Sequence, residues 1–410
     1  MKTDLDRLMA ERGLDTLVVA SDDLYCPMRD YLTNGARVGG AFVIKRRGAA
    51  PIPFVNPMEA EEARASGLEV YTFNDLGRGE LAREHQGDPL AVEVELWVRA
   101  FERLGVAPGK VGVYGTGALH RSLELVRALT ERLPGYTFAG EHGLSLFEAA
   151  YVTKDAEEIA RLKAVAARTS AVVRATWDFI ASHRASGGTV ITASGAPLTI
   201  GDVKRFVRRA LLDRDLEETN MIFAQGRDGG FPHSRGQNDM PLQTGQAVVF
   251  DLFPHEIGGG YYHDMTRTWC IGSAPAEVQT AYDQVRAAFD LAVAAYKEPG
   301  QPAHTLQDAV LDYFEGLGHP TTRSAPSATS GYVHSLGHGL GLNVHERPSL
   351  SHLRRDDTLQ VGSVFTIEPG LYYPDQGFGV RLEDTFYIDE GGALIALTDV
   401  PKTLVLPLQG

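Results

Sequence analysis

Two stretches of this sequence share one pattern, and that pattern decides the fold that we expect. Ala-Val-Val-Phe-Asp at residues 247–251 is an apolar strand that ends in an acid, and Asp264 follows 13 residues later. Val-Phe-Thr-Ile-Glu at residues 364–368 repeats the arrangement, and Glu383 follows 15 residues later. Gly, Tyr and Pro residues inside each interval suit a hairpin connection. We predict two hairpins, produced by an internal duplication, that face each other across a pocket with one carboxylate on each strand.

A predominantly helical segment precedes each hairpin. Asp155 is a plausible N-cap for a long amphipathic helix, and Glu158 stands where the reciprocal residue of a capping box belongs. A break at Gly187 and Gly188 follows. Further helices are predicted at about 200–214, 276–296 and 304–316 from their apolar periodicity.

The first 145 residues have a different organisation, in which strands alternate with helices. Short strands are predicted at residues 16–20, 41–44, 52–55, 68–73 and 110–114. Apolar residues three or four apart predict a helix whose buried face contains Leu123, Val126, Leu129 and Leu133. We therefore expect a two-domain α/β protein, with a small amino-terminal domain at 1–150 and an α+β catalytic domain at 152–406. The amino-terminal part shows no cluster of catalytic groups.

The amino-acid composition indicates which classes of protein this chain can belong to. The chain has 410 residues, of which 43% are hydrophobic and 22% charged, as in ordinary globular proteins. Its formal net charge of -14 disfavours nucleic acid as a partner. No apolar stretch is long enough to span a membrane, and the acidic start does not resemble a secretory signal. The only two cysteines, Cys26 and Cys270, are expected to be buried and free, which fits a cytoplasmic protein.

The negative charges of the acids that end the apolar strands require nearby positive charge. Asp251 and Glu368 are expected to be buried, and an unpaired buried carboxylate is costly. Arg267 and Arg381 are available as ion-pair partners. Four acids in two matched hairpins need more positive charge than two arginines supply, which favours a pair of metal ions over strand-end acids at a solvated rim.

Three of the 13 histidines, namely His334, His338 and His345, fall in one glycine-rich stretch at residues 331–346. The spacing of the first two permits a helical ligand pair, but the glycines disfavour a helix there. Seven histidines elsewhere are expected to be structural or on the surface: His85, His120, His142, His183, His304, His319 and His352.

Four carboxylates and an imidazole form an oxygen-rich ligand set. That set favours Mn²⁺ or Fe²⁺, with Co²⁺ and Zn²⁺ as alternatives, over a sulfur-rich structural zinc site. Two divalent cations that share carboxylates would lower the pKa of a bridging water and yield a hydroxide nucleophile. Neighbouring histidines would bind the carbonyl that this nucleophile attacks.

At this point the sequence resembles the pita-bread metallopeptidases, a family that includes prolidase, aminopeptidase P, methionine aminopeptidase and the metal-free relative creatinase. The resemblance covers residues 152–406. Its motif elements are His233, Asp251, Gly-Tyr-Tyr-His-Asp-Met-Thr-Arg-Thr at 260–268, the histidine stretch, Thr-Ile-Glu-Pro-Gly at 366–370 and Val-Arg-Leu-Glu-Asp at 380–384.

The resemblance implies a metal-binding role for five residues. Asp251 would chelate one ion, Asp264 and Glu383 would bridge, and His338 with Glu368 would hold the other ion. Mn²⁺ is the most plausible metal. Thr266 matches a hydroxyl behind the metal ligands.

The resemblance also implies which residues act on the substrate. Glu368 matches a proton shuttle, and His334 and His345 match histidines that contact substrate and stabilise the tetrahedral intermediate. His233 matches a histidine on the proline side, and Arg381 matches an arginine beside the site.

The implied activity is hydrolysis of the Xaa-Pro bond of small peptides, most plausibly as a dipeptidase of the prolidase type and alternatively as an aminopeptidase P. A creatinase-like C–N hydrolase and a non-catalytic peptide-binding module are disfavoured because all five ligand positions are intact. A homodimer is expected from symmetry statistics. The Asp251–Asp264 connection is longer than the family commonly uses, and we interpret its His255 and the adjacent His263 as residues outside the reaction.

Overall fold

The structure is a computed structural model that describes residues 4–409. Contacts divide the chain into two compact units. The first contains the described residues up to Ala150 together with Gly258–Gly260. The second contains Tyr151–Ile257 and the described residues from Tyr261 onward.

The first unit is built on one six-stranded sheet. In spatial order its strands are β4 (Tyr71–Thr72), β3 (Ile52–Val55), β2 (Ala41–Arg46), β1 (Thr16–Ser21), β5 (Lys110–Thr116) and β6 (Thr137–Ala139). Strand β1 pairs antiparallel with β2 and parallel with β5. The strand predicted at 68–73 is reduced to two residues, because its partner β3 ends at Val55 and Asn56 then caps a 3-10 helix at Pro57–Glu59.

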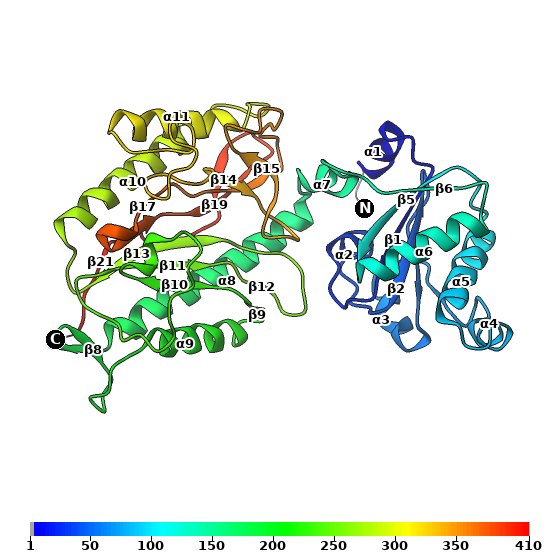
Figure 1. The fold of residues 1–410 in the computed structure, drawn as a ribbon, viewed down its shortest axis with the longest axis horizontal. Helices are drawn as coiled ribbons and strands as arrows, with labels where there is room; N and C mark the ends of the chain where they lie inside the picture. The colour runs from blue at the N-terminus through cyan, green and yellow to red at the C-terminus, as the bar shows by residue number, and fades with distance from the viewer. Residues whose placement is uncertain (1–3, 410) are drawn as a thin grey trace. The chain divides into compact units, whose positions relative to one another are not determined.

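Helices cover both faces of this sheet. In Figure 1, α5 (Pro89–Leu104) and α6 (Leu119–Arg132) lie on one face and α2 (Pro27–Leu32) on the other. The α6 helix was predicted with Leu123 and Leu129 on its buried face. Leu129 is buried as predicted, whereas Leu123 is 66% exposed and Leu125 is buried in its place. The remaining helices of this part of the chain are α1 (Leu5–Glu11), α3 (Ala60–Arg64), α4 (Arg78–Glu84) and α7 (Leu146–Tyr151).

The second unit contains the same arrangement twice, namely a helix pair followed by a sheet whose central strands are antiparallel. The first helix pair is α8 (Ala156–Ala181) and α9 (Ile200–Leu212), and α8 begins with the predicted capping box of Asp155 and Glu158. The sheet that follows has the order β10 (Ile222–Gln225), β11 (Ala247–Leu252), β13 (Met265–Ile271) and β21 (Val405–Leu406). Two strand pairs flank it, β7 (Arg184–Ser186) with β8 (Thr189–Ile191) and β9 (Leu216–Glu217) with β12 (His255–Glu256).

The second repetition begins with α10 (Ala276–Ala295) and α11 (His304–Gly316), close to the predicted bounds. Its sheet has the order β15 (Glu346–Leu350), β14 (Gly337–Gly339), β16 (Val364–Ile367), β19 (Asp384–Ile388) and β20 (Leu394–Ala396). Strands β17 (Gly370–Tyr373) and β18 (Phe378–Arg381) form a separate hairpin. Figure 1 shows the strands of this unit between α8 and α9 on one side and α10 and α11 on the other.

Both predicted strand pairings are present, since β11 pairs with β13 and β16 pairs with β19. The prediction of two simple hairpins with one carboxylate on each strand is wrong in two respects. Of the four acids, only Asp251 lies within a strand, and the β17–β18 hairpin lies between β16 and β19. Leu306 and Val310 of α11 share one buried apolar cluster with Phe365 and Ile367 of β16. Each such buried side chain contributes about 1.5–3 kcal/mol, so the strand that ends at Glu368 is firmly held.

Two smaller expectations concern the whole chain. Cys26 and Cys270 are buried and free, as predicted. Among the described residues, every helix is too short or too polar to cross a bilayer.

Candidate metal centre

The four acids lie where the two sheets of the second unit meet. Asp251 stands opposite Thr266 in the β11–β13 register, and Asp264 directly precedes β13. Glu368 directly follows β16, and Glu383 lies between β18 and β19. The Glu383 amide donates to the Thr266 carbonyl at 3.1 Å. This contact joins the two hairpins and brings their acids together.

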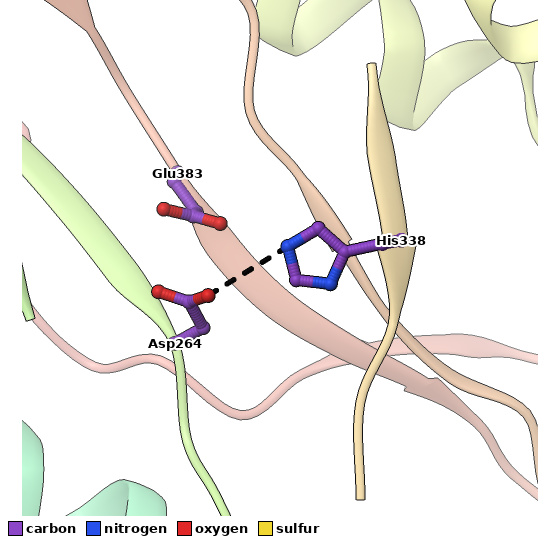
Figure 2. A group of neighbouring side chains, drawn as sticks. All are labelled: Asp264, His338 and Glu383. Carbon is purple, nitrogen blue, oxygen red and sulfur yellow. Dashed lines mark ion pairs between the residues drawn. The ribbon is translucent and has the colours of Figure 1, made fainter. Parts of the chain in front are cut away.

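His338 faces these acids from β14. Its Nε2 lies 3.4 Å from Glu368 Oε1 and 3.7 Å from Asp264 Oδ2. Asp264, His338 and Glu383 each offer a ligand atom, and these atoms all lie within 4.8 Å of one another. Figure 2 shows both carboxylates pointing toward the imidazole ring. The ring Nδ1 lies 3.0 Å from the Gly339 carbonyl, so Nδ1–H donates there and the Nε2 lone pair faces the acids.

Two glycines allow His338 to take this place on a strand. A Cβ atom at Gly337 would lie 2.0 Å from the Thr366 carbonyl oxygen, and one at Gly339 would lie 2.1 Å from the Arg347 carbonyl oxygen. Both neighbours are backbone atoms and have little freedom to move. The glycine pattern that disfavoured a helix at this point therefore has a physical cause, which is close packing of β14 between β15 and β16.

The protein alone leaves the acids short of positive charge. Burial raises the pKa of Asp264 well above its usual range, and the charges of Asp251 and Glu368 raise that pKa further. Burial also raises the pKa of Glu368 to about 8, although Arg381 opposes this shift. The pKa of Glu383 rises because of burial and the charge of Asp264.

The hydrogen bonding of the acids is incomplete as well. Asp251 Oδ1 and Asp264 Oδ1 are buried, and neither has a hydrogen-bond partner among the described residues. Burial lowers the pKa of His338 to about 3, so its imidazole is neutral and able to act as a ligand. Buried carboxylates with unpartnered oxygens, beside a neutral imidazole, fit a divalent cation site.

Arg381 holds one edge of this site together. Its Nη2 donates to Asp251 Oδ2 at 2.6 Å, its Nε to Thr266 Oγ1 at 3.0 Å, and its Nη1 to the Tyr372 hydroxyl at 2.7 Å. Thr266 Oγ1 in turn donates to Glu383 Oε2 at 2.7 Å. The guanidinium lines the cavity, but each of its nitrogens already has a protein acceptor.

The histidines expected to contact substrate differ in their surroundings. His334 is held by two partners, since its Nδ1 lies 2.7 Å from the Ser335 carbonyl and its Nε2 lies 3.0 Å from the Tyr372 hydroxyl. His345 is exposed on the cavity wall, with its ring 4.4 Å from that of His338. His233 is also exposed on this wall.

The cavity has a volume of about 520 Å³. All nine residues expected to bind metal or substrate line it: His233, Asp251, Asp264, His334, His338, His345, Glu368, Arg381 and Glu383. Sequence reasoning missed Asn220, Phe253 and Arg235, which also line it. None of these three stands in a recognisable pattern, so only the structure reveals them.

His255 and His263, from the long connection, lie outside this lining. His263 is buried with its Nε2 3.0 Å from Thr398 Oγ1, and His255 Nδ1 lies 2.8 Å from the Glu256 carbonyl. Both rings are therefore bound to neighbouring protein groups away from the acids.

The protonation of the acids leads to a prediction about metal binding and pH. Carboxyls with raised pKa values hold protons near neutral pH, and a cation must displace those protons. We expect metal-free protein to bind Mn²⁺ more tightly as the pH rises from about 6 to about 8, with net proton release. Calorimetry in two buffers of different ionisation enthalpy measures the protons released. Affinity that falls over this range, or no proton release, would contradict the protonation described above.

The arrangement of two helix-backed sheets around a carboxylate-rich cavity defines a class of metal-dependent hydrolases. The model of metallopeptidase family M24 matches residues 160–390, and the chain belongs to this family. This confirms the resemblance inferred from the motifs.

Two curated relatives illustrate the similarity. The chain is 37% identical over 181 residues to a putative dipeptidase of Bacillus subtilis, which covers 44% of this chain and 46% of that protein. It is 38% identical over 173 residues to an Xaa-Pro dipeptidase of Pyrococcus furiosus, which covers 42% of this chain and 45% of that protein. The matches thus span about half the length of these relatives.

Solved structures share the fold over nearly the whole chain. An X-Pro aminopeptidase from Thermotoga maritima has a TM-score of 0.74 at 20% identity and covers 99% of both chains. A prolidase from Pyrococcus furiosus has a TM-score of 0.72 at 23% identity and covers 97% of this chain and 99% of that chain. These likenesses confirm the two-domain α/β fold with a pita-bread catalytic part.

Proposed function

We propose that this chain is a dinuclear-metal exopeptidase that hydrolyses the bond before proline, with residues 152–406 as its catalytic domain. The observation that supports this most is the convergence of Asp251, Asp264, His338, Glu368 and Glu383 on one cavity, with carboxylate oxygens that have no protein donor. The names of the relatives, a dipeptidase, an Xaa-Pro dipeptidase and an X-Pro aminopeptidase, agree with this reaction class.

Each of the five proposed metal ligands has its own role. Asp251 would chelate one cation, His338 and Glu368 the other, and Asp264 with Glu383 would bridge the two. When bound, two divalent cations supply Lewis-acid charge and lower the pKa of water. The chain itself orients the ligands, since Thr266 donates to Glu383 and Arg381 donates to Asp251.

We assign proton transfer and binding of the scissile carbonyl to side chains at the cavity wall. Glu368 lines the cavity, with its Oε1 3.4 Å from His338 Nε2. We assign it the transfer of a proton to the departing proline nitrogen. His345 would donate a hydrogen bond to the oxygen of the scissile carbonyl, and His233 and His334 would line the substrate path.

Three further properties belong to the proposal. Mn²⁺ is the expected metal, because the ligand set is mostly oxygen. The expected assembly is a homodimer. A cytoplasmic location agrees with two buried, free cysteines.

The test of the reaction class is hydrolysis of Ala-Pro against Ala-Ala, with added Mn²⁺ and with a chelator. We expect turnover of Ala-Pro at least about tenfold above that of Ala-Ala, and loss of both activities with the chelator. Full turnover by metal-free protein, or equal turnover of the two dipeptides, would refute the proposal.

Arg235 favours the dipeptidase over the aminopeptidase P alternative. Its side chain is exposed, lines the cavity and has no ion-pair partner among the described residues, in contrast with the fully engaged Arg381. The backbone beside it is fixed, since a Cβ at Gly236 would lie 2.2 Å from the Phe223 carbonyl oxygen. A guanidinium in this position suits the free carboxylate of Xaa-Pro better than a continuing amide.

We expect wild-type protein to prefer Ala-Pro over Ala-Pro-amide, and Arg235→Ala to reduce that preference by about tenfold in kcat/KM. Arg227→Ala is the matched control, because Arg227 lies against the Phe231 ring and outside the cavity lining. A preference that survives Arg235→Ala, or better turnover of Ala-Pro-Ala than of Ala-Pro, would favour the aminopeptidase P alternative and leave the metal assignments in place.

A further inference from the structure

The first unit contains a second cavity, of about 640 Å³, which is larger than the metal cavity of about 520 Å³. It opens where β1 and β5 end, at Ser21 and Thr116. These two strands are parallel neighbours, and the chain leaves β1 toward β2 on the opposite side. In open α/β sheets, ligands bind at the carboxyl ends of strands where the connections diverge in this way.

The floor of this cavity is aromatic. Phe42, Phe73 and Trp97 line it and are buried, with the Phe42 ring 5.3 Å from that of Trp97 and 5.9 Å from that of Phe73. Trp97 is 1% exposed, yet its Nε1–H has no acceptor among the described residues. An aromatic floor suits a ligand that has an apolar body.

One part of the rim is suited to an anion. The α6 helix starts at Leu119, immediately beyond the end of β5, and its N-cap residue Ala118 supplies no side-chain acceptor. Arg121 lines the cavity from the first turn of this helix. This part of the rim therefore offers a guanidinium to an anion.

Another part of the rim is suited to a cation. Asp22 and Glu93 both line the cavity. Burial and the charge of Asp22 raise the pKa of Glu93, whereas Arg121 lowers it, so the three groups lie within electrostatic reach of one another. Two neighbouring carboxylates are relieved by an added positive charge.

The net charge of the side chains around the cavity indicates which kind of anionic ligand the cavity can bind. Asp22, Glu59 and Glu93 place three negative charges around this cavity, and Arg78 and Arg121 place two positive charges. A ligand with two negative charges, such as a phosphate monoester, is disfavoured by this excess of acids, whereas a carboxylate joined to an ammonium is neutral overall.

We propose that this cavity binds a free α-amino acid with an apolar side chain. The carboxylate lies against Arg121, and the ammonium lies between Asp22 and Glu93. The apolar side chain rests on Phe42, Phe73 and Trp97. The site is separate from the metal centre and does not depend on the reaction assigned to it.

The test is calorimetric titration of the full chain with L-leucine, in the presence of a chelator. We expect one saturable site per chain. Isocaproate, which lacks the ammonium, and isoamylamine, which lacks the carboxylate, should each bind at least about tenfold more weakly. Arg121→Ala and Glu93→Gln should weaken leucine binding by a similar factor.

Two variants serve as controls. Arg127→Ala lies on the same helix, where Arg127 pairs with Glu124 and Glu131 outside the cavity, and it should bind leucine normally. His345→Ala alters the metal cavity and should also bind leucine normally. Absence of a saturable site in the wild-type chain would overturn the proposal, as would loss of binding in His345→Ala. Inorganic phosphate binding more tightly than leucine would overturn the ligand assignment.

Discussion

Asp264→Asn and Glu383→Gln should each remove bound metal and reduce kcat by more than about a hundredfold. The reason is that both side chains lie within ligand distance of His338 and are assigned to bridge two cations. Loss of a group that merely orients a ligand typically costs about 10–100-fold, so loss of the ligand itself should cost more. Metal content by elemental analysis and kcat on Ala-Pro are the two measurements.

The matched control is Asp375→Asn, an equivalent acid-to-amide change at an exposed position in the turn between β17 and β18. It should retain metal and activity. Misfolding is distinguished by thermal unfolding of metal-free protein, where Asp264→Asn should be at least as stable as wild type. Its amide removes one member of a group of mutually repelling buried acids. Normal metal content in both bridging variants would refute the bridging assignment.

The acids of the site were predictable because they mark the ends of regular elements. Asp251 lies in β11 at the end of an apolar run, and Glu368 directly follows such a run in β16. A charged residue that interrupts an alternating or continuous apolar pattern can be recognised from the sequence alone. The hairpin signals after Asp251 predict the pairing of β11 with β13. Those after Glu368 instead form the β17–β18 hairpin, which lies between β16 and its partner β19.

The residues that surround these acids in the site could not be predicted from the sequence in this way. Tyr372 contacts both His334 and Arg381 through its hydroxyl, yet in the sequence it is one of two adjacent tyrosines without distinguishing context. Its position depends on the register of β17 against β18, where Tyr372 pairs with Gly379. Arg235 lies in a loop, where no periodicity constrains the direction of a side chain. Both contacts arise from tertiary packing.

Tertiary packing also explains why the buried face of α6 was predicted incorrectly at Leu123. Helical periodicity placed Leu123 and Leu129 on one apolar face. Leu129 does belong to the buried cluster of the first unit, but Leu125 and not Leu123 joins it there. The exposed Leu123 lies beside Ser122, which lines the cavity at the end of β5. Periodicity identifies a helix, whereas the orientation of its face depends on the surface against which it packs.

His345→Ala should reduce kcat by about 10²–10³-fold while metal content stays normal, which is the cost of losing one donor to a developing oxyanion. His345 lies on the cavity wall, where partial desolvation and the neighbouring His233 lower its pKa, so its ring is neutral at pH 7 and carries one N–H. His334 differs, because its Nδ1–H donates to the Ser335 carbonyl and its Nε2 accepts from the Tyr372 hydroxyl. Neither of its ring nitrogens is left to donate to a substrate.

His334→Ala should therefore lower the rate less than His345→Ala and act by releasing Tyr372, so Tyr372→Phe should reproduce most of its effect. His120→Ala, at an exposed position in α6, is the matched histidine control and should leave kcat and KM unchanged. Full activity of His345→Ala with an unchanged KM would show that this ring is structural. A larger loss in His334→Ala than in His345→Ala would show that the Tyr372 hydroxyl turns away when substrate binds and frees His334 to donate.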